Sequence, residues 1–221
     1  MMHVTYQELM RTTLCFYGIR AQKESVAIMP PTFGVVVHAQ GRYWAFTVAH
    51  TMAPEDETLE ITSGAHPAIA AQYKMGTDAV LLAKIDPQSR SEWLVDKDHD
   101  LMAIPLADYE GPAWHAPGDI AAGNDHLLQP ALIFVPDFAP NPKGELTMVG
   151  SGLAGIISDE DDNQAIISAQ GASGMSGAPV VIRGAQGYTL LGLYTGTPTT
   201  TPLTNKALHE LAKVTKCRLF G

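Results

Sequence analysis

Short strand-like runs follow one another along most of this 221-residue chain, and turn-forming residues separate them. The clearest pair, residues 33–38 and 43–48, is rich in valine and aromatic side chains and is joined by a turn that contains Gly41. β-branched and aromatic residues favour strands, glycine favours tight turns, and many such runs at close spacing are typical of β-barrels and sandwiches. We therefore predict an all-β protein. Further strands are expected near residues 12–19, 58–62, 67–74, 78–86, 100–106, 131–135, 146–149, 152–157, 164–169, 180–182 and 188–194.

Two further features concern the organisation of the chain: a boundary between two units and a helix near the C-terminus. A Pro/Gly-rich connection around residues 111–123 predicts a boundary between an N-terminal unit, residues 1–115, and a C-terminal unit, residues 116–221. Near the C-terminus, apolar residues recur at helical spacing: Leu203, Ala207, Leu208, Leu211, Ala212 and Val214. This spacing predicts one amphipathic helix over residues 204–217, packed on the body of the protein.

A glycine-rich stretch, residues 171–179, reads Gly-Ala-Ser-Gly-Met-Ser-Gly-Ala-Pro and precedes the apolar run 180–182. Glycines let the backbone turn tightly and gather N–H groups in one small space, where they can bind a developing oxyanion. Ser176 is the candidate nucleophile. Ser173 competes with it, but only Ser176 is followed by the Gly-Ala-Pro that leads into a strand. A small-residue turn without chemistry is the alternative interpretation.

A serine nucleophile needs a histidine base, and the histidine needs a carboxylate to fix its tautomer. His50 follows the strand-like run 43–48 and is therefore expected at the rim of a sheet, with a packed core histidine as the alternative. Asp100 opens the apolar run 101–106, whereas its competitors Asp96 and Asp98 do not. The other histidines considered are expected to be surface or turn residues: His38, His66, His99, His115 and His126.

The order His50, Asp100, Ser176 and the motifs around these residues resemble the trypsin-like (chymotrypsin-fold) serine peptidases. Here the motifs read Thr-Val-Ala-His, Asp-Leu-Met-Ala and Gly-Met-Ser-Gly-Ala-Pro. In that family they read Thr-Ala-Ala-His, Asp-Ile-Ala and Gly-Asp-Ser-Gly-Gly-Pro. Chain order argues against two rivals, because an α/β-hydrolase needs its Asp or Glu and then its histidine after the serine, and a subtilisin needs an aspartate before the histidine. After Ser176 the only acid is Glu210 and the only histidine is His209, and no aspartate precedes His50.

The resemblance implies a double antiparallel β-barrel and gives each residue a role. Ser176 would attack the scissile carbonyl, His50 would take its proton and later donate it to the leaving amine, and Asp100 would orient His50. The backbone N–H groups of Gly174 and Ser176 would form the oxyanion hole.

The resemblance also implies a substrate-binding pocket between residues 168–173 and residues 194–197. Gln170 falls near its base and carries no counter-charge for a buried lysine or arginine, so we expect cleavage after a small or medium uncharged residue. Thr195, Gly196 and Thr197 are expected to form an edge strand on which the substrate backbone pairs.

Met175 is a departure from the family. Secreted trypsin-like enzymes usually carry an acid at this place, where it pairs with a newly cut N-terminus. A methionine cannot pair with an ammonium group, so we expect activity that does not depend on an N-terminal cleavage of the trypsin kind.

Composition narrows the classes of partner. The formal net charge is −9 and only 17% of residues are charged, which excludes a broad basic surface for nucleic acid or anionic membranes.

Cys15 and Cys217 stand near opposite ends of the chain, which predicts buried free thiols and no disulfide framework. The N-terminus lacks the pattern of a signal peptide and no apolar run is long enough to span a bilayer, so we expect a cytoplasmic protein. The acidic run 159–162 is interpreted as a solvated loop, with a weak cation site as the alternative.

Together these features predict a serine endopeptidase that needs no metal or organic cofactor and makes a limited, regulatory cleavage in a protein or peptide substrate. A regulatory protein is expected as a second class of partner. Two alternatives stay open at this point. One is a catalytically silent binding or scaffold protein with the peptidase fold, and the other is an esterase on the same scaffold.

Overall fold

A computed structural model of the protein describes residues 6–21, 26–28, 31–51, 58–63, 81–85, 92–140, 142, 146–172, 174–184, 187–196 and 211–217. Within these ranges the chain is almost entirely β-structure, as predicted. The exceptions are the short helix α1, Tyr6–Thr12, and a 3₁₀ turn, Ala49–Thr51. No helix in the described ranges is long and apolar enough to cross a bilayer.

The N-terminal half of the described chain forms one nine-stranded sheet in which β6, β5, β1, β3, β4, β8 and β7 lie side by side, while β2 pairs with β1 and β9 with β3. Its strands are β1 Thr13–Ala21, β2 Val26–Ile28, β3 Thr32–Ala39, β4 Arg42–Thr47, β5 Thr58–Thr62, β6 Leu81–Ile85, β7 Leu94–Asp96, β8 Leu101–Leu106 and β9 Trp114–His115. The predicted hairpin is present as β3 and β4, with Ala39 opposite Arg42. Gln40 and Gly41 have φ of 51° and 74°, the pair of positive values that a tight two-residue hairpin turn requires.

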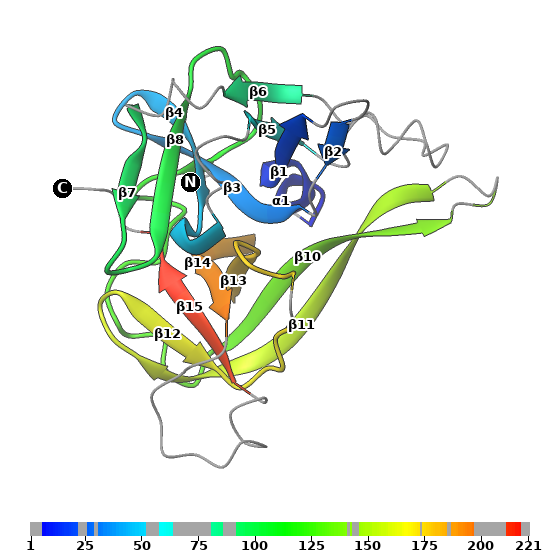
Figure 1. The fold of residues 1–221 in the computed structure, drawn as a ribbon. Coiled ribbons are helices and arrows are strands. Elements are labelled where there is room, and N and C mark those ends of the chain that lie inside the picture. The colour runs from blue at the N-terminus through cyan, green and yellow to red at the C-terminus, as the bar shows by residue number, and fades with distance from the viewer. Residues whose placement is uncertain are drawn as a thin grey trace.

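The C-terminal half forms a closed barrel in the order β10, β11, β12, β15, β14, β13. These strands are β10 Pro130–Pro140, β11 Leu146–Glu160, β12 Gln164–Ile167, β13 Pro179–Gly184, β14 Gly187–Gly196 and β15 Ala212–Lys216. The hairpin of β10 and β11 is long enough to extend beyond the barrel, as Figure 1 shows at the right. Closure leaves no free sheet edge where the strands are paired, although β14 runs on to Gly196, past its pairing with β13 at Leu193.

The predicted C-terminal helix is wrong over residues 212–216, which form the strand β15. Ala212 and Val214 are fully buried, and β15 pairs with β12 on one side and with β14 on the other. Without this strand both neighbours would keep an unpaired edge, so barrel closure overrides the weak helical spacing of the apolar residues. The part of the expected helix at residues 204–210 lies outside the described residues.

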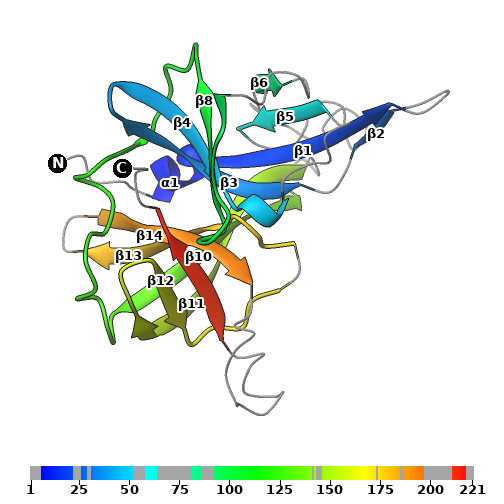
Figure 2. The ribbon, with the colours of Figure 1, turned by 60° about the vertical axis from the view of Figure 1, so that its left-hand side comes forward.

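The two sheets share their apolar cores. Phe46 of β4 and Leu193 of β14 belong to one cluster of buried side chains, and Phe33 of β3 and Val180 of β13 belong to another. Figures 1 and 2 show the N-terminal sheet, in blue to green, stacked on the barrel, in light green to red. The carboxyl end of β4 and the loop before β13 therefore come together although they are far apart in the sequence.

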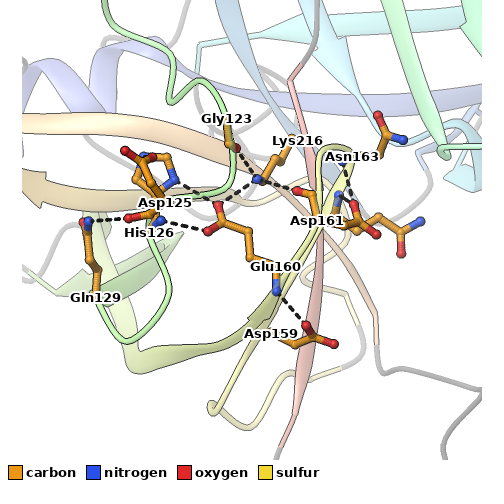
Figure 3. A network of polar contacts seen from close by, with 10 residues as sticks. Gly123, Asp125, His126, Gln129, Asp159, Glu160, Asp161, Asn163 and Lys216 are labelled. Atoms are coloured by element: carbon orange, nitrogen blue, oxygen red, sulfur yellow. Dashed lines mark hydrogen bonds and ion pairs between the residues drawn. The ribbon is translucent and has the colours of Figure 1, made fainter.

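The acidic run 159–162 is not a simple solvated loop, because one of its members is buried in an ion pair (Figure 3). Lys216 Nζ lies 2.7 Å from Glu160 Oε1 and also donates to the carbonyl oxygens of Gly123, at 2.7 Å, and Asp161, at 2.6 Å. The side chains of Glu160 and Lys216 are 1% and 3% exposed. The cation beside this acidic run is therefore the chain's own lysine, which joins β15, the end of β11 and the connection between the two halves.

His126 completes this network. Expected at the surface or in a turn, it has a side chain only 12% exposed, and its Nδ1 lies 2.9 Å from Glu160 Oε1 while its backbone N–H donates to Glu160 Oε2 at 2.8 Å. Burial by itself would raise the pKa of Glu160, but hydrogen bonds from Lys216 and His126 outweigh it and hold the pKa below its ordinary value of 4.5. The carboxylate is thus charged in the folded protein at neutral pH.

We expect Glu160→Gln to destabilise the protein by about 3–5 kcal/mol at pH 7, because it leaves the Lys216 ammonium buried without a counter-charge. A carboxyl with a lowered pKa stabilises the fold above its ordinary pKa of 4.5, and this contribution disappears as the pH falls through the lowered pKa. The difference between variant and wild type in urea unfolding should therefore shrink toward pH 3. Asp159→Asn, at the exposed neighbouring acid, is the matched control. Equal losses in the two variants would contradict a stabilising role for the ion pair.

Candidate active site

His50 stands in the 3₁₀ turn directly after β4, and Asp100 stands in the turn between β7 and β8. Because β8 pairs with β4 in the sheet, the two turns meet at the same edge. Their backbones are joined as well, since the N–H of Ala49 donates to the Asp100 carbonyl oxygen at 3.2 Å. The sheet itself therefore brings the histidine and the carboxylate together.

Asp100 holds His50 through both carboxylate oxygens. Oδ2 lies 2.6 Å from His50 Nδ1, and Oδ1 accepts the backbone N–H of His50 at 2.8 Å. Asp100 has φ of 56°, a left-handed conformation that aspartate tolerates better than most residues. This carboxylate fixes the direction of the imidazole and leaves Nε2 free to face the barrel.

The competing acid Asp96 is engaged elsewhere. Its Oδ2 lies 2.6 Å from His99 Nδ1, and its Oδ1 accepts the N–H groups of Asp98 and His99, both at 3.1 Å. The hydrogen bond with His99 is the main reason why the pKa of Asp96 lies below its ordinary value. These bonds shape the turn that carries Asp100, so of the three candidate acids only Asp100 reaches His50.

Ser176 completes the arrangement from the barrel side. Its Oγ lies 3.0 Å from His50 Nε2, although 126 residues separate the two in the sequence. The loop that carries it is tied to both sheets: Phe33 of β3 donates its N–H to the Ser176 carbonyl oxygen at 2.9 Å, and the N–H of Gly177 donates to the Tyr194 carbonyl oxygen at 2.8 Å. Ser173, the other serine considered, lies outside the described residues.

Gly177 is the point of closest approach between the loop and the N-terminal sheet. It has φ of 79°, and a Cβ added to it would overlap the carbonyl oxygen of Phe33. That carbonyl cannot move easily, because it also accepts a hydrogen bond from Thr47 Oγ1 at 2.6 Å. A glycine is required here for the serine to reach the histidine.

Gly174 is needed for its backbone conformation. It has φ of 88°, but a Cβ added to it would have no atom within 4 Å, so the requirement is conformational and not steric. In the described part of the chain, the amides of Gly174 and Ser176 donate to no protein acceptor. Amides without a partner in the protein are what an oxyanion hole needs.

Met175, between these two residues, is only 7% exposed and belongs to the buried core of the barrel. Its sulfur accepts the N–H of Ala172 at 3.2 Å, and its backbone N–H donates to the Ala172 carbonyl oxygen at 3.3 Å. Apolar packing and local hydrogen bonds thus shape the loop at the position where trypsin-like enzymes use a charged pair.

The residues predicted to bind substrate are partly covered by the structure. Gln170 is exposed, and Thr195 and Gly196 stand half-buried at the end of β14. Gly196 is paired with Lys213 of β15, and Thr195 Oγ1 donates to the Lys213 carbonyl oxygen at 3.3 Å. Thr197 lies outside the described residues, as does His66 among the remaining histidines.

Both cysteines are free and buried, as predicted. Burial raises the pKa of the Cys15 and Cys217 thiols to about 12, so neither forms a thiolate at neutral pH. Among the described residues no group of three His, Cys, Asp or Glu side chains is arranged to hold a metal ion. The group that contacts His50 Nε2 among the described residues is the Ser176 hydroxyl.

Sequence reasoning missed the residues that support this site. Phe33, Thr47 and Tyr194 act through backbone groups, a hydroxyl or packing. Thr47 opens the Thr-Val-Ala-His motif and Tyr194 opens the expected pocket wall, but nothing in the sequence indicates that they contact the loop of Ser176. Each contacts the serine loop, the segment 171–178 that carries Ser176, from a strand elsewhere in the fold, so its role depends on the pairing of whole strands.

Gly177→Ala should destabilise the protein more than Gly174→Ala. Alanine at positive φ costs about 1–2 kcal/mol at either position, and overlap with the Phe33 carbonyl adds about 1–3 kcal/mol at position 177 alone. Urea unfolding of the two variants beside wild type measures the difference. Equal costs would contradict the close approach of the loop to β3.

No protein-family model matches the sequence, and neither does any curated protein sequence. Solved structures do resemble the fold. Catalytically active tobacco etch virus protease in complex with product aligns at a TM-score of 0.56 and 10% identity, over 96% of this chain and 76% of that one. Tobacco vein mottling virus protease aligns at 0.55 and 10% identity, over 98% of this chain and 82% of that one. At this identity the likeness shows the fold, and the fold is chymotrypsin-like.

Proposed function

We propose that this protein is a serine endopeptidase that cleaves a protein or peptide substrate through an acyl-enzyme intermediate. The observation that carries the proposal is the continuous chain of contacts from Asp100 Oδ2 through His50, at 2.6 Å, to Ser176 Oγ, at 3.0 Å. A nucleophile, a base and an orienting carboxylate in contact form the arrangement that activates a serine hydroxyl. The chymotrypsin-like fold adds support, because tobacco etch virus protease has been solved with its substrate and with its product.

The proposed reaction gives each of these residues one role. Ser176 Oγ attacks the scissile carbonyl carbon while its proton passes to His50 Nε2, and Asp100 stabilises the resulting imidazolium. The negative oxygen of the tetrahedral intermediate accepts hydrogen bonds from the amides of Gly174 and Ser176. His50 then gives the proton to the leaving amine, which leaves an ester on Ser176. Water, deprotonated by His50, attacks this ester, and the released proton returns to Ser176 as the carboxylic acid departs.

The nucleophile of this chain is proposed to be a serine, whereas the tobacco etch virus protease is a cysteine protease. Two observations support the serine. Ser176 is the hydroxyl in contact with His50, and both cysteines are buried with thiol pKa values of about 12. The reaction as derived uses the chain's own groups and needs no metal or organic cofactor.

The substrate is proposed to bind as an added strand along the end of β14, through Thr195, Gly196 and Thr197. No acid is expected beneath the substrate side chain, because the residue at that place is Gln170. We further propose that the enzyme acts in the cytoplasm, makes a limited cleavage in a particular protein and has a regulatory protein as a second partner.

Labelling with a fluorophosphonate probe tests the mechanism directly. The probe is expected to modify Ser176 alone, as mapped by mass spectrometry, and Ser176→Ala and His50→Ala should abolish labelling. Asp100→Asn should lower the rate of reaction by about 10⁴, because the amide no longer holds the required tautomer of His50. His115→Ala, at an exposed histidine outside the site, is the matched control and should react at the wild-type rate.

Persistent labelling of the Ser176→Ala variant would contradict the assignment of Ser176 as the nucleophile. A folded wild-type protein that binds peptide but never reacts would instead be a catalytically silent scaffold. Hydrolysis of esters without any hydrolysis of matched amides would identify an esterase.

The uncleaved chain should be active, because Met175 packs in the barrel core and shapes the loop without an ion pair to a new N-terminus. Intact-mass analysis of the labelled protein is expected to show the full-length chain plus one probe adduct. Labelling confined to a shortened chain would show that processing is required.

A further inference from the structure

We propose that Tyr194 is a specificity-determining residue that limits the substrate residue before the scissile bond to glycine, alanine or serine. This inference rests on the proposed function and names its substrate class. The backbone of Tyr194 is joined to the serine loop in both directions: its carbonyl oxygen accepts the N–H of Gly177 at 2.8 Å, and its N–H donates to the Ala178 carbonyl oxygen at 2.9 Å. Tyr194 therefore has a fixed position next to Ser176.

The phenol ring of Tyr194 spans the space between β14 and the segment that precedes the serine. A Cβ added to Gly171 would overlap the hydroxyl oxygen and two ring carbons of Tyr194, so the far end of the ring lies against the Gly171 backbone. Tyr194 as a whole is 3% exposed and shares a buried cluster with Ala169 and Met175. One aromatic side chain thus fills the gap between the two segments that flank the nucleophile.

These two segments are also the expected walls of the pocket for the side chain next to the scissile carbonyl. Gln170, expected near the base of that pocket, is exposed, and the space beside Gly171 is occupied by the ring of Tyr194. A leucine or phenylalanine side chain would have to displace a ring that is fixed at both its backbone and its far end. A hydrogen, a methyl group or a hydroxymethyl group needs no such displacement.

The inference can be tested with aminoalkyl diphenyl phosphonates, which carry one substrate-like side chain on the carbon next to phosphorus. Ser176 Oγ forms a bond to phosphorus, phenoxide leaves, and the serine proton reaches phenoxide through His50. The alanine analogue is expected to label wild-type protein at least tenfold faster than the leucine and phenylalanine analogues, because one methylene too many in a pocket already costs about 10–200-fold in rate. Analogues that lack the side chain measure the reactivity of the serine itself.

Variants at position 194 separate the ring from its hydroxyl. Tyr194→Val should raise the rate for the phenylalanine analogue relative to the alanine analogue by at least tenfold, while Tyr194→Phe should retain the wild-type preference. Tyr188→Ala, which removes a half-buried tyrosine from the same strand, is the matched control and should also retain it.

The outcomes distinguish this inference from the proposed function. Wild-type labelling that is as fast with the phenylalanine analogue as with the alanine analogue would overturn the role of Tyr194 and leave the serine mechanism standing. The absence of labelling by the fluorophosphonate and by every analogue would overturn the mechanism, and the size limit with it. If Tyr194→Val does not fold, the wild-type preference and that of Tyr194→Phe still decide the matter.

Discussion

The contact between the serine loop and β3 is the interaction on which the site depends. His50 and Asp100 belong to one sheet and Ser176 to the other, and the bond from the Phe33 N–H to the Ser176 carbonyl oxygen joins them at 2.9 Å. A hydrogen bond between neutral backbone groups adds only about 0.5–1.5 kcal/mol to stability. Its larger effect is positional, because a shift of 1 Å at Ser176 would separate the hydroxyl from His50 Nε2. Shared apolar cores hold the two sheets together, and this bond fixes their register at the site.

The N-terminal sheet contains two histidine–carboxylate pairs that have similar contacts but different roles. Asp96 and His99 lie within one turn, and their contact stabilises the loop that delivers Asp100. Asp100 and His50 come from different turns, and the imidazole is left with one nitrogen directed at a hydroxyl 3.0 Å away. The difference lies in the third partner, since only His50 contacts a group that can become a nucleophile. A histidine–carboxylate pair therefore supports a catalytic role only where the second ring nitrogen also contacts a group that can react.

The motif order singled out three residues that the structure brings into contact, because each stands close to a strand whose apolar pattern is clear, as with residues 43–48 before His50. The hairpin at Gly41 followed from the same local signals. The strand β15 could not be predicted from local signals. Its apolar residues Ala212 and Val214 also fit, with apolar residues farther upstream, one face of a helix. Its identity depends on two free edges, those of β12 and β14, which arise only once the barrel is assembled. The buried pair of Glu160 and Lys216 was hidden for the same reason: 56 positions separate a residue in an acidic run from one in a terminal strand.

The glycines of the serine loop look alike in the sequence, but three of them are needed for three different physical reasons. Gly171 has no side chain because the ring of Tyr194 occupies that space, and Gly177 has none because the Phe33 carbonyl does. Gly174 has open space around it, and its φ of 88° is what an L-residue would resist. Glycine content alone predicted a tight turn with gathered amides, which accounts for Gly174. The other two glycines allow close contacts with other strands: Gly177 brings the loop of Ser176 against β3, and Gly171 leaves room for the ring of Tyr194.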